Sequence, residues 1–231
     1  MPFLVVPAGG RGLRMGAGRP KQFLDWGGRP LIKATIDAFF APDMPALDGV
    51  AVALPLDRLG EAAGWAFPAP HRCCAGGETR QESVAAALSL IEGAPDDVVL
   101  IHDAVRPFPP AAPIKEALAA VLGGWDGAVL AEASTDTLKQ VGEDLRVRGT
   151  LPRERIYRAQ TPQAARLSTW LRAFAWAKSE GFAGTDDVSI LEAMGLSVKA
   201  IPSPPSNRKI TVPEDWEMLR PEKGRGFLPD V

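Results

Sequence analysis

Cysteine and histidine are scarce in this chain of 231 residues, which has two of each. The two cysteines, Cys73 and Cys74, are adjacent, and that spacing does not suit an ordinary structural disulfide. No second Cys/His pair is present to complete a zinc site. We therefore expect both cysteines to be strand residues without a redox role.

The sequence also lacks a long apolar run and a long block of like charge. No apolar stretch reaches the length needed to span a bilayer, and the first residues show no charged leader with a cleavage site. The 26 basic and 28 acidic residues are dispersed and leave a formal net charge of -2. This balance argues against a protein that coats nucleic acid or a membrane surface. Because a membrane span and a leader are also missing, we expect a cytoplasmic enzyme.

Apolar residues make up 46% of the chain, enough for a substantial core, and we expect a single domain over residues 1–231. Strand-like and helix-like runs alternate, which predicts a Rossmann-like, doubly wound α/β fold with a mostly parallel sheet. Strands are expected at residues 3–6, 49–54, 98–101, 127–131 and 198–201, and from His71 onward. Helices are expected at 31–40, near 57–63, after the capping-box pattern Thr79-x-x-Glu82, from Pro113 to Gly123, at 170–178 and 186–194, and from Pro213.

One segment, residues 134–158, interrupts this alternation. It is polar and carries a Gly-Glu-Asp turn between two short runs with some β character. It has too few apolar residues to belong to the core, so we expect a projecting β-hairpin arm. A solvated surface loop is the alternative.

The stretch PAGGRGLRMG, residues 7–16, follows the first expected strand. It matches neither the P-loop nor the dinucleotide-binding fingerprint, because the required Lys-Ser/Thr and the third Gly are missing. Its glycines expose backbone N–H groups, and Arg11, Arg14 and Lys21 supply positive charge. This pattern predicts a binding loop for a nucleoside triphosphate, with a basic surface turn as the alternative.

The sequence HDAVRP, which begins at His102, follows the apolar run at 98–101. An Asp just beyond the carboxyl end of a buried strand is well placed to hold Mg²⁺ bridged to phosphate oxygens, so Asp103 is the candidate metal ligand. Arg106 is placed to bind a second phosphate group. We interpret His102 as a packing or hydrogen-bonding neighbour, and the alternative for Asp103 is a helix cap or turn residue.

Six motifs follow one another along the chain: PAGGRGLRMGAGRPKQF, GGETRQESV, HDAVRP, DTLK, AQTPQ and NRKIT. Together they resemble the 2-C-methyl-D-erythritol 4-phosphate cytidylyltransferases of the non-mevalonate isoprenoid pathway, from Pro7 to about Trp216. The first motif is shared with many sugar nucleotidyltransferases. The next two narrow the resemblance to cytidylyltransferases, and the last three narrow it further.

The resemblance implies CTP and a small alcohol phosphate as substrates, Mg²⁺ as cofactor and a role for individual residues. The residues implied to bind the nucleotide are Pro7, Ala8, Gly9, Gly10, Arg11, Gly12, Arg14, Lys21, Gly77, Glu78, Arg80, Ser83, Asp103 and Ala104. Of these, Gly77, Glu78 and Ser83 are implied to recognise cytosine, although some relatives have Asp in place of Glu78. Asp103 matches the Mg²⁺ ligand.

The acceptor, by the same resemblance, is bound by Arg106, Thr137, Arg153, Thr185 and Lys209. The implied catalytic cations are Arg14, Lys21, Arg153 and Lys209. In relatives, the segment matching the arm at 134–158 forms the dimer and reaches into the neighbouring subunit's site. The resemblance therefore implies a homodimer through this arm.

The expected chemistry agrees with these residue types. A phosphate monoester that attacks a phosphoanhydride brings two anions together, so the site needs cations and alignment rather than a general base. Two alternatives remain: a ribitol-5-phosphate cytidylyltransferase, which shares PKQF, the GG turn and HDAVRP, and a non-catalytic nucleotide-sensing module on the same fold. DTLK and the spacing from Arg153 to Gln163 favour methylerythritol phosphate, and the presence of Asp103 with its cations favours an enzyme.

Overall fold

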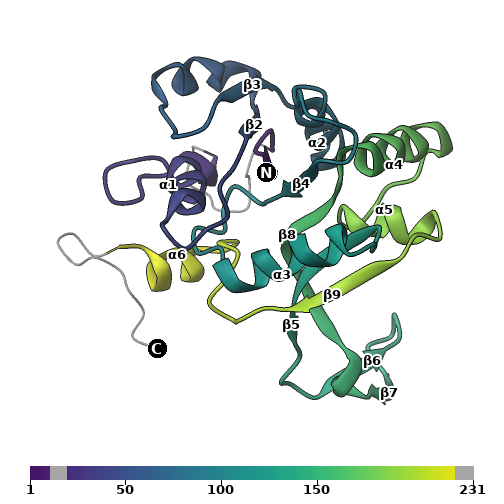
Figure 1. The fold of residues 1–231 in the computed structure, drawn as a ribbon. Helices are drawn as coiled ribbons and strands as arrows, with labels where there is room; N and C mark the ends of the chain where they lie inside the picture. The colour runs from purple at the N-terminus through teal and green to yellow at the C-terminus, as the bar shows by residue number, and fades with distance from the viewer. Residues whose placement is uncertain (11–19, 222–231) are drawn as a thin grey trace.

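The structure is a computed structural model that describes residues 1–10 and 20–221. Within these residues a seven-stranded sheet has the strand order β3-β2-β1-β4-β8-β5-β9 (Figure 1). The strands are β1 (Phe3–Pro7), β2 (Gly49–Leu54), β3 (His71–Ala75), β4 (Val98–Ile101), β5 (Gly127–Ala133), β8 (Tyr157–Arg166) and β9 (Val198–Pro202). Strand β8 runs antiparallel to β4 and β5, and the other neighbours are parallel.

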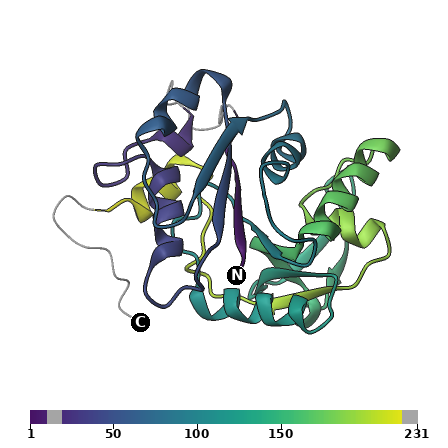
Figure 2. The same cartoon turned by 45° about the horizontal axis from the view of Figure 1, so that its top comes forward.

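Helices cover both faces of this sheet (Figure 2). They are α1 (Leu31–Asp37), α2 (Arg80–Leu88), α3 (Ala111–Leu122), α4 (Leu167–Glu180), α5 (Val188–Ala193) and α6 (Pro213–Leu219). Side chains alternate along β1, so that Leu4 and Val6 pack with α1 and α3, whereas Val5 packs with α2, α4 and α5. Coverage on both faces explains why β2 and β4 are buried along their whole length and read as continuous apolar runs.

The predicted α/β fold with a mostly parallel sheet is confirmed, with differences in detail. Residues 56–64 form a 3₁₀ helix, and the helix expected at 31–40 ends at Asp37 and continues as a 3₁₀ turn. Strand β8 was not predicted, because its sequence YRAQTPQAAR is polar and contains a proline, which rarely occurs inside a central strand. Its buried polar residues Gln160, Thr161 and Gln163 are instead satisfied by hydrogen bonds.

The projecting hairpin is also confirmed. Within the described part of the chain, strands β6 (Leu138–Val141) and β7 (Val147–Leu151) pair only with each other, and they extend away from the main sheet (Figure 1). The turn is closed by the amide of Gly142, which donates to the carbonyl of Arg146 over 3.0 Å. The last residues of the segment expected as the arm, Tyr157 and Arg158, belong to β8 and therefore to the main sheet.

Two further expectations concern the cysteines and the membrane. Cys73 and Cys74 lie in β3, and both thiols are free. Burial raises the pKa of both thiols. Across residues 1–10 and 20–221, none of the helices has the length and apolar character that crossing a membrane requires.

Candidate active site

The site begins where β1 and β3 end, because two glycines bring the following turns into contact. A Cβ atom on Gly9 would lie 3.0 Å from the Cα atom of Gly76 and 2.6 Å from the hydroxyl of Ser83, and one on Gly76 would meet Gly9 at 2.8 Å. Only glycine permits this approach. Ser83, in the first turns of α2, is buried against both turns and donates to the carbonyl of Thr79 over 2.9 Å.

The side chain of Gln22 fixes the turn after β1. Its amide nitrogen donates to the carbonyls of Ala8, at 2.8 Å, and of Gly10, at 2.7 Å. Gln22 is buried and belongs to the PKQF motif, but no role was predicted for it from the sequence. Arg11, Gly12 and Arg14, which the sequence assigned to nucleotide binding, lie outside the described residues.

The next part of the site is the turn that leads into α2. Thr79 and Glu82 form the expected capping box: Thr79 accepts from the amide of Glu82, and the Glu82 carboxylate accepts from the amide of Thr79. Gly77 is close-packed against this box, since a Cβ atom there would lie 2.3 Å from that of Glu82. Glu78 is exposed. The cap therefore fixes the backbone on which the implied cytosine-binding residues stand.

Asp103 follows β4 and is the centre of the site. Its carboxylate is buried with only 7% of the residue exposed, and three cations among the described residues surround it. Arg80 Nε lies 3.2 Å from Oδ1, whereas Lys209 Nζ lies 2.9 Å and Arg106 Nε 3.5 Å from Oδ2. Burial by itself would raise the pKa of Asp103, but the positive charges outweigh it and hold the pKa well below its ordinary value.

Arg80 is held by a second carboxylate as well. Its two terminal nitrogens donate to Asp187 Oδ1 and Oδ2 at 2.6 and 2.7 Å, and Asp187 is 1% exposed. Burial raises the pKa of Asp187, whereas the two carboxylates raise the pKa of Arg80 against the effect of its own burial. Arg80 keeps its proton, as arginine does in proteins, and the two short hydrogen bonds have the geometry of an arginine–carboxylate pair. The sequence did not assign Asp187 a role.

Arg106 and His102 anchor the segment that carries Asp103. Arg106 Nη1 donates to the carbonyl of Asn207 over 2.7 Å, which ties this segment to the NRKIT motif. His102 is fully buried; Nε2 lies 3.0 Å from the carbonyl of Arg106, and Nδ1 lies 3.1 Å from Thr161 Oγ1. Burial lowers the pKa of His102 to about 4, so the ring is neutral and serves as the hydrogen-bonding neighbour that the sequence predicted.

A cleft of about 310 Å³ lies at the carboxyl edge of β4, and Asp103 is one of the residues that line it. Of the sequence-predicted residues that the structure describes, five line it: Arg80, Asp103, Arg106, Thr185 and Lys209. Residues that the sequence did not assign complete the wall: Ala159, Gln160, Thr161, Gln163 and Asp186. Four of these five belong to the AQTPQ motif. The match of this motif to the family was therefore the feature of the sequence that could have identified them.

Two predicted acceptor residues lie elsewhere. Thr137 precedes β6 and Arg153 follows β7, so both belong to the arm and neither lines the cleft of their own chain. Arg153 Nη1 donates to the carbonyl of Thr135 over 2.8 Å. Lys21 is also outside the cleft lining, and its ammonium group donates to the carbonyl of Ile210 over 2.7 Å.

The donor set at Asp103 suits Mg²⁺. Mg²⁺ is usually bound by one or two carboxylates together with substrate phosphates, and the described part of the chain has no cluster of three or more His, Cys, Asp or Glu side chains that would hold a metal alone. A carboxylate has about four lone-pair positions. Among the described residues, Arg80 Nε contacts Oδ1 of Asp103, whereas Arg106 and Lys209 contact Oδ2. Because Oδ1 has two lone pairs, one of them is left for a metal ion.

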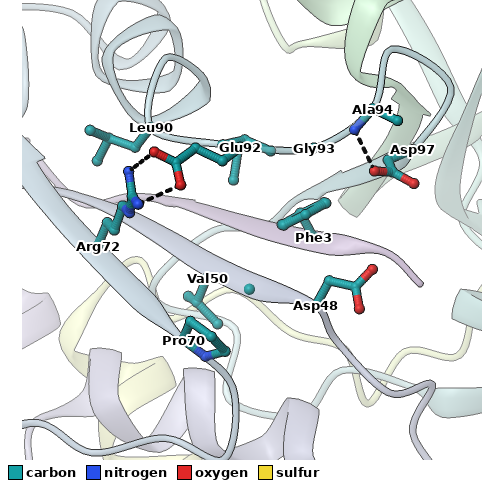
Figure 3. A pocket seen from close by; sticks show the side chains of 12 residues that line it. Phe3, Asp48, Val50, Pro70, Arg72, Leu90, Glu92, Gly93, Ala94 and Asp97 are labelled. Atoms are coloured by element: carbon teal, nitrogen blue, oxygen red, sulfur yellow. Dashed lines mark hydrogen bonds and ion pairs between the residues drawn. The ribbon is translucent and has the colours of Figure 1, made fainter.

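A second cavity, of about 440 Å³, lies at the opposite, amino-terminal end of β1 and β2 (Figure 3). Its charged side chains already have partners: Arg72 makes two hydrogen bonds of 2.5 Å with Glu92, and Asp97 accepts from the amide of Ala94. Asp48 pairs with the amino group of Met1 at 2.9 Å. Ligands of open α/β sheets bind at the carboxyl ends of the strands, so the cleft at Asp103 is the candidate active site.

Known proteins match this chain along most of its length. The family model for 2-C-methyl-D-erythritol 4-phosphate cytidylyltransferase matches residues 3–220. A protein of that name from Acidobacterium capsulatum is 40% identical over 228 residues, which cover 94% of each chain. Another from Geotalea uraniireducens is 41% identical over 216 residues, which cover 91% of each chain.

Solved structures of the same name share the fold. The crystal structure from Francisella tularensis has a TM-score of 0.80 and 31% sequence identity, and the match covers 94% of this chain and 97% of that one. The structure from Thermus thermophilus has a TM-score of 0.71 and 31% identity, with 93% and 95% covered.

Proposed function

Because the chain belongs to the 2-C-methyl-D-erythritol 4-phosphate cytidylyltransferase family, we propose that it transfers CMP from CTP to 2-C-methyl-D-erythritol 4-phosphate. The products are 4-diphosphocytidyl-2-C-methyl-D-erythritol and pyrophosphate. The observation that carries this proposal is the buried Asp103 carboxylate with three cations around it, in a cleft beside the glycine-rich turn after β1.

In the proposed reaction, a phosphate oxygen of the acceptor attacks the α-phosphorus of CTP. A new P–O bond forms as the bond between the α-phosphorus and the bridging oxygen to the β-phosphorus breaks, and pyrophosphate leaves with that electron pair. The acceptor phosphate is already largely ionised at pH 7, so no side chain has to remove a proton. The protein has to align two anions and neutralise their charge.

The cleft residues divide between these tasks. Asp103 would hold Mg²⁺, which when bound neutralises phosphate charge on the nucleotide. Arg106, Thr185 and Lys209 would bind the acceptor, since they line the cleft together and two of them carry positive charge. Lys209 is about 41% exposed at its side chain, so its ammonium group is accessible to an incoming phosphate while it contacts Asp103.

The nucleotide would lie across the turns after β1 and β3. The triphosphate would be bound by the backbone from Pro7 to Gly10 and by Lys21. Arg11, Gly12 and Arg14, which lie outside the described residues, would bind it as well. Gly77, Glu78 and Ser83 would recognise cytosine, supported by the packing of Ser83 against Gly9. Arg80 and Ala104 flank Asp103 and complete this group of proposed nucleotide-binding residues.

The proposed site is completed by a second copy of the chain. Thr137 and Arg153 lie on the arm at 134–158 and do not line the cleft of their own chain. We propose that residues 1–231 form one nucleotidyltransferase domain and that its arm forms a homodimer, so that Arg153 of each protomer reaches the cleft of its partner. An isologous interface of this kind gives two equivalent composite sites.

Pyrophosphate release tests this function. The purified protein is incubated with CTP and Mg²⁺ and with either methylerythritol phosphate or ribitol 5-phosphate, and an excess of EDTA serves as the metal control. We expect release with methylerythritol phosphate that EDTA abolishes. Faster release with ribitol 5-phosphate would assign the other acceptor, and no release with either would refute the proposed activity.

A further inference from the structure

The two carboxylates that hold Arg80 differ in how tightly they bind it. Asp187 accepts two hydrogen bonds of 2.6 and 2.7 Å in the two-pronged geometry that arginine and carboxylate prefer. Asp103 accepts one, from Nε, at 3.2 Å. That distance is longer than is usual for a hydrogen bond between two charged groups. Asp187 is therefore the main partner of Arg80, and Asp103 is a secondary one.

Rigid elements fix both members of the Arg80–Asp187 pair. Arg80 is the first residue of α2, immediately after the capping box at Thr79. Asp187 immediately precedes α5, and the amide of Val188 donates to Gln163 of β8 over 2.8 Å. The guanidinium group thus bridges two helix starts and the end of β4. It has little freedom to move toward either carboxylate while both are present.

We propose that Asp187 is a positioning residue that holds the guanidinium group of Arg80 back from Asp103 and so keeps a lone pair on Asp103 Oδ1 for Mg²⁺. This inference rests on the proposed function, because it concerns the metal ligand of the same site. Without the negative charge of Asp187, the nearest remaining carboxylate for Arg80 is that of Asp103. The guanidinium would then take both oxygens of Asp103 and compete with the metal ion.

The variant Asp187→Asn tests this proposal, because it removes the charge and keeps the shape. The readout is the ratio of the CTP dissociation constant in EDTA to that in saturating Mg²⁺, measured by isothermal titration calorimetry. This ratio isolates the contribution of the metal from other effects on nucleotide binding. We expect it to fall by about 10- to 100-fold, the range typical for loss of a group that orients a metal ligand.

Glu92→Gln is the matched control. Glu92 makes the same two-pronged pair with an arginine, Arg72, but in the cavity at the opposite end of the strands. Its loss should leave the ratio unchanged. A lower melting temperature of Asp187→Asn with an unchanged ratio would mean that the pair is only structural, and would overturn the proposal.

The double variant Arg80→Met/Asp187→Asn gives a second test. If the loss in Asp187→Asn is caused by Arg80 moving onto Asp103, removal of Arg80 should restore the ratio to within about twofold of the Arg80→Met single variant. A double variant as impaired as Asp187→Asn would contradict the proposal. If Asp187→Asn does not fold, the Arg80→Met variant alone tests the proposal. A tenfold fall in its ratio of CTP dissociation constants would mean that Mg²⁺ binding requires Arg80 itself, which would contradict the proposal.

Failure of the proposed function would be visible separately. If the wild-type protein bound CTP with the same affinity in EDTA and in Mg²⁺, the metal assignment at Asp103 would be wrong. A wild-type protein that shows the Mg²⁺ effect, with an Asp187→Asn variant that shows it equally, would refute only the positioning role.

Discussion

Lys209 and Asp103 are joined by a contact of 2.9 Å between the ammonium group and the carboxylate. The next residue, Ile210, accepts a hydrogen bond of 2.7 Å from the ammonium group of Lys21. The amide of Ile210 in turn donates to the carbonyl of Val105, two residues after Asp103. One short segment thus holds the proposed nucleotide-side cation, the proposed acceptor-side cation and the candidate metal ligand in a fixed arrangement.

Lys209→Ala should mainly affect the acceptor. Loss of one hydrogen bond between charged groups weakens binding by about 1.5–3 kcal/mol, so the KM for methylerythritol phosphate should rise by about 10- to 150-fold. The dissociation constant for CTP should stay close to the wild-type value. Steady-state kinetics with varied acceptor, together with calorimetric CTP binding, measure the two effects.

Lys21→Ala should instead lower kcat. A cation that neutralises charge developing at the α-phosphate contributes in the transition state, and loss of such a group typically costs about 100- to 1,000-fold in kcat. The acceptor KM should change little. If both lysine variants lost CTP affinity equally, the division between nucleotide-side and acceptor-side cations would be wrong.

Subunit mixing tests whether the arm completes the neighbouring site. Asp103→Asn and Arg153→Ala, each of which we expect to be nearly inactive alone, are unfolded and refolded together so that half of the dimers are mixed. In a mixed dimer with a shared site, one site carries both changes and the other carries neither. Activity should return to about a quarter of the wild-type value.

The alternative outcome of mixing is equally clear. If Arg153 served the cleft of its own chain, every site would keep one change and mixing would restore nothing. Equal amounts of wild-type protein refolded by the same procedure control for losses on refolding.

His102 should make the folded state sensitive to mild acid. Its pKa falls from 6.5 to about 4 because it is buried. The unfolded chain therefore binds a proton at a higher pH than the folded protein, and stability is lost as the pH falls below 6.5. Between pH 6.5 and 5 this residue should cost about 2 kcal/mol of unfolding free energy.

The variant His102→Asn isolates this effect, because the asparagine side chain also has a donor group and an acceptor group but does not titrate. Urea unfolding at pH 6.5 and pH 5 should show a loss of stability that is about 2 kcal/mol smaller in the variant than in the wild type. The difference between the two proteins cancels other groups that titrate in this range. Equal losses would show that His102 does not set the acid sensitivity.

The elements that the sequence predicted are those whose own residues determine them. The apolar run of β4, the capping box of α2 and the Gly-Glu-Asp turn of the arm each specify their structure locally, and each was confirmed. Strand β8 was missed because its place in the sheet depends on partners distant in sequence. Gln160 lies near the middle of this strand, and its side chain accepts hydrogen bonds from Ser203 and Asn207.

The candidate site, like the fold, was predicted where its residues stand in local motifs and missed where they do not. Asp103, Arg106 and Lys209 stand in recognisable motifs, and the structure brings them together. Asp187 was not found, because a single buried carboxylate before a short helix has no pattern of its own. Its partner Arg80 is far away in the chain, and only the folded structure shows their two short hydrogen bonds.

Phosphorus-31 NMR of the reaction itself tests the central claim, which is that the cleft at Asp103 carries out cytidylyl transfer. Wild-type protein and Asp103→Asn are each followed with CTP, Mg²⁺ and methylerythritol phosphate. The wild type should form a diphosphate-linked product and pyrophosphate in equal amounts, and the variant should be slower by orders of magnitude even at high Mg²⁺. Wild-type protein that consumed CTP without forming the diphosphate, or a variant that formed it at the wild-type rate, would contradict the account.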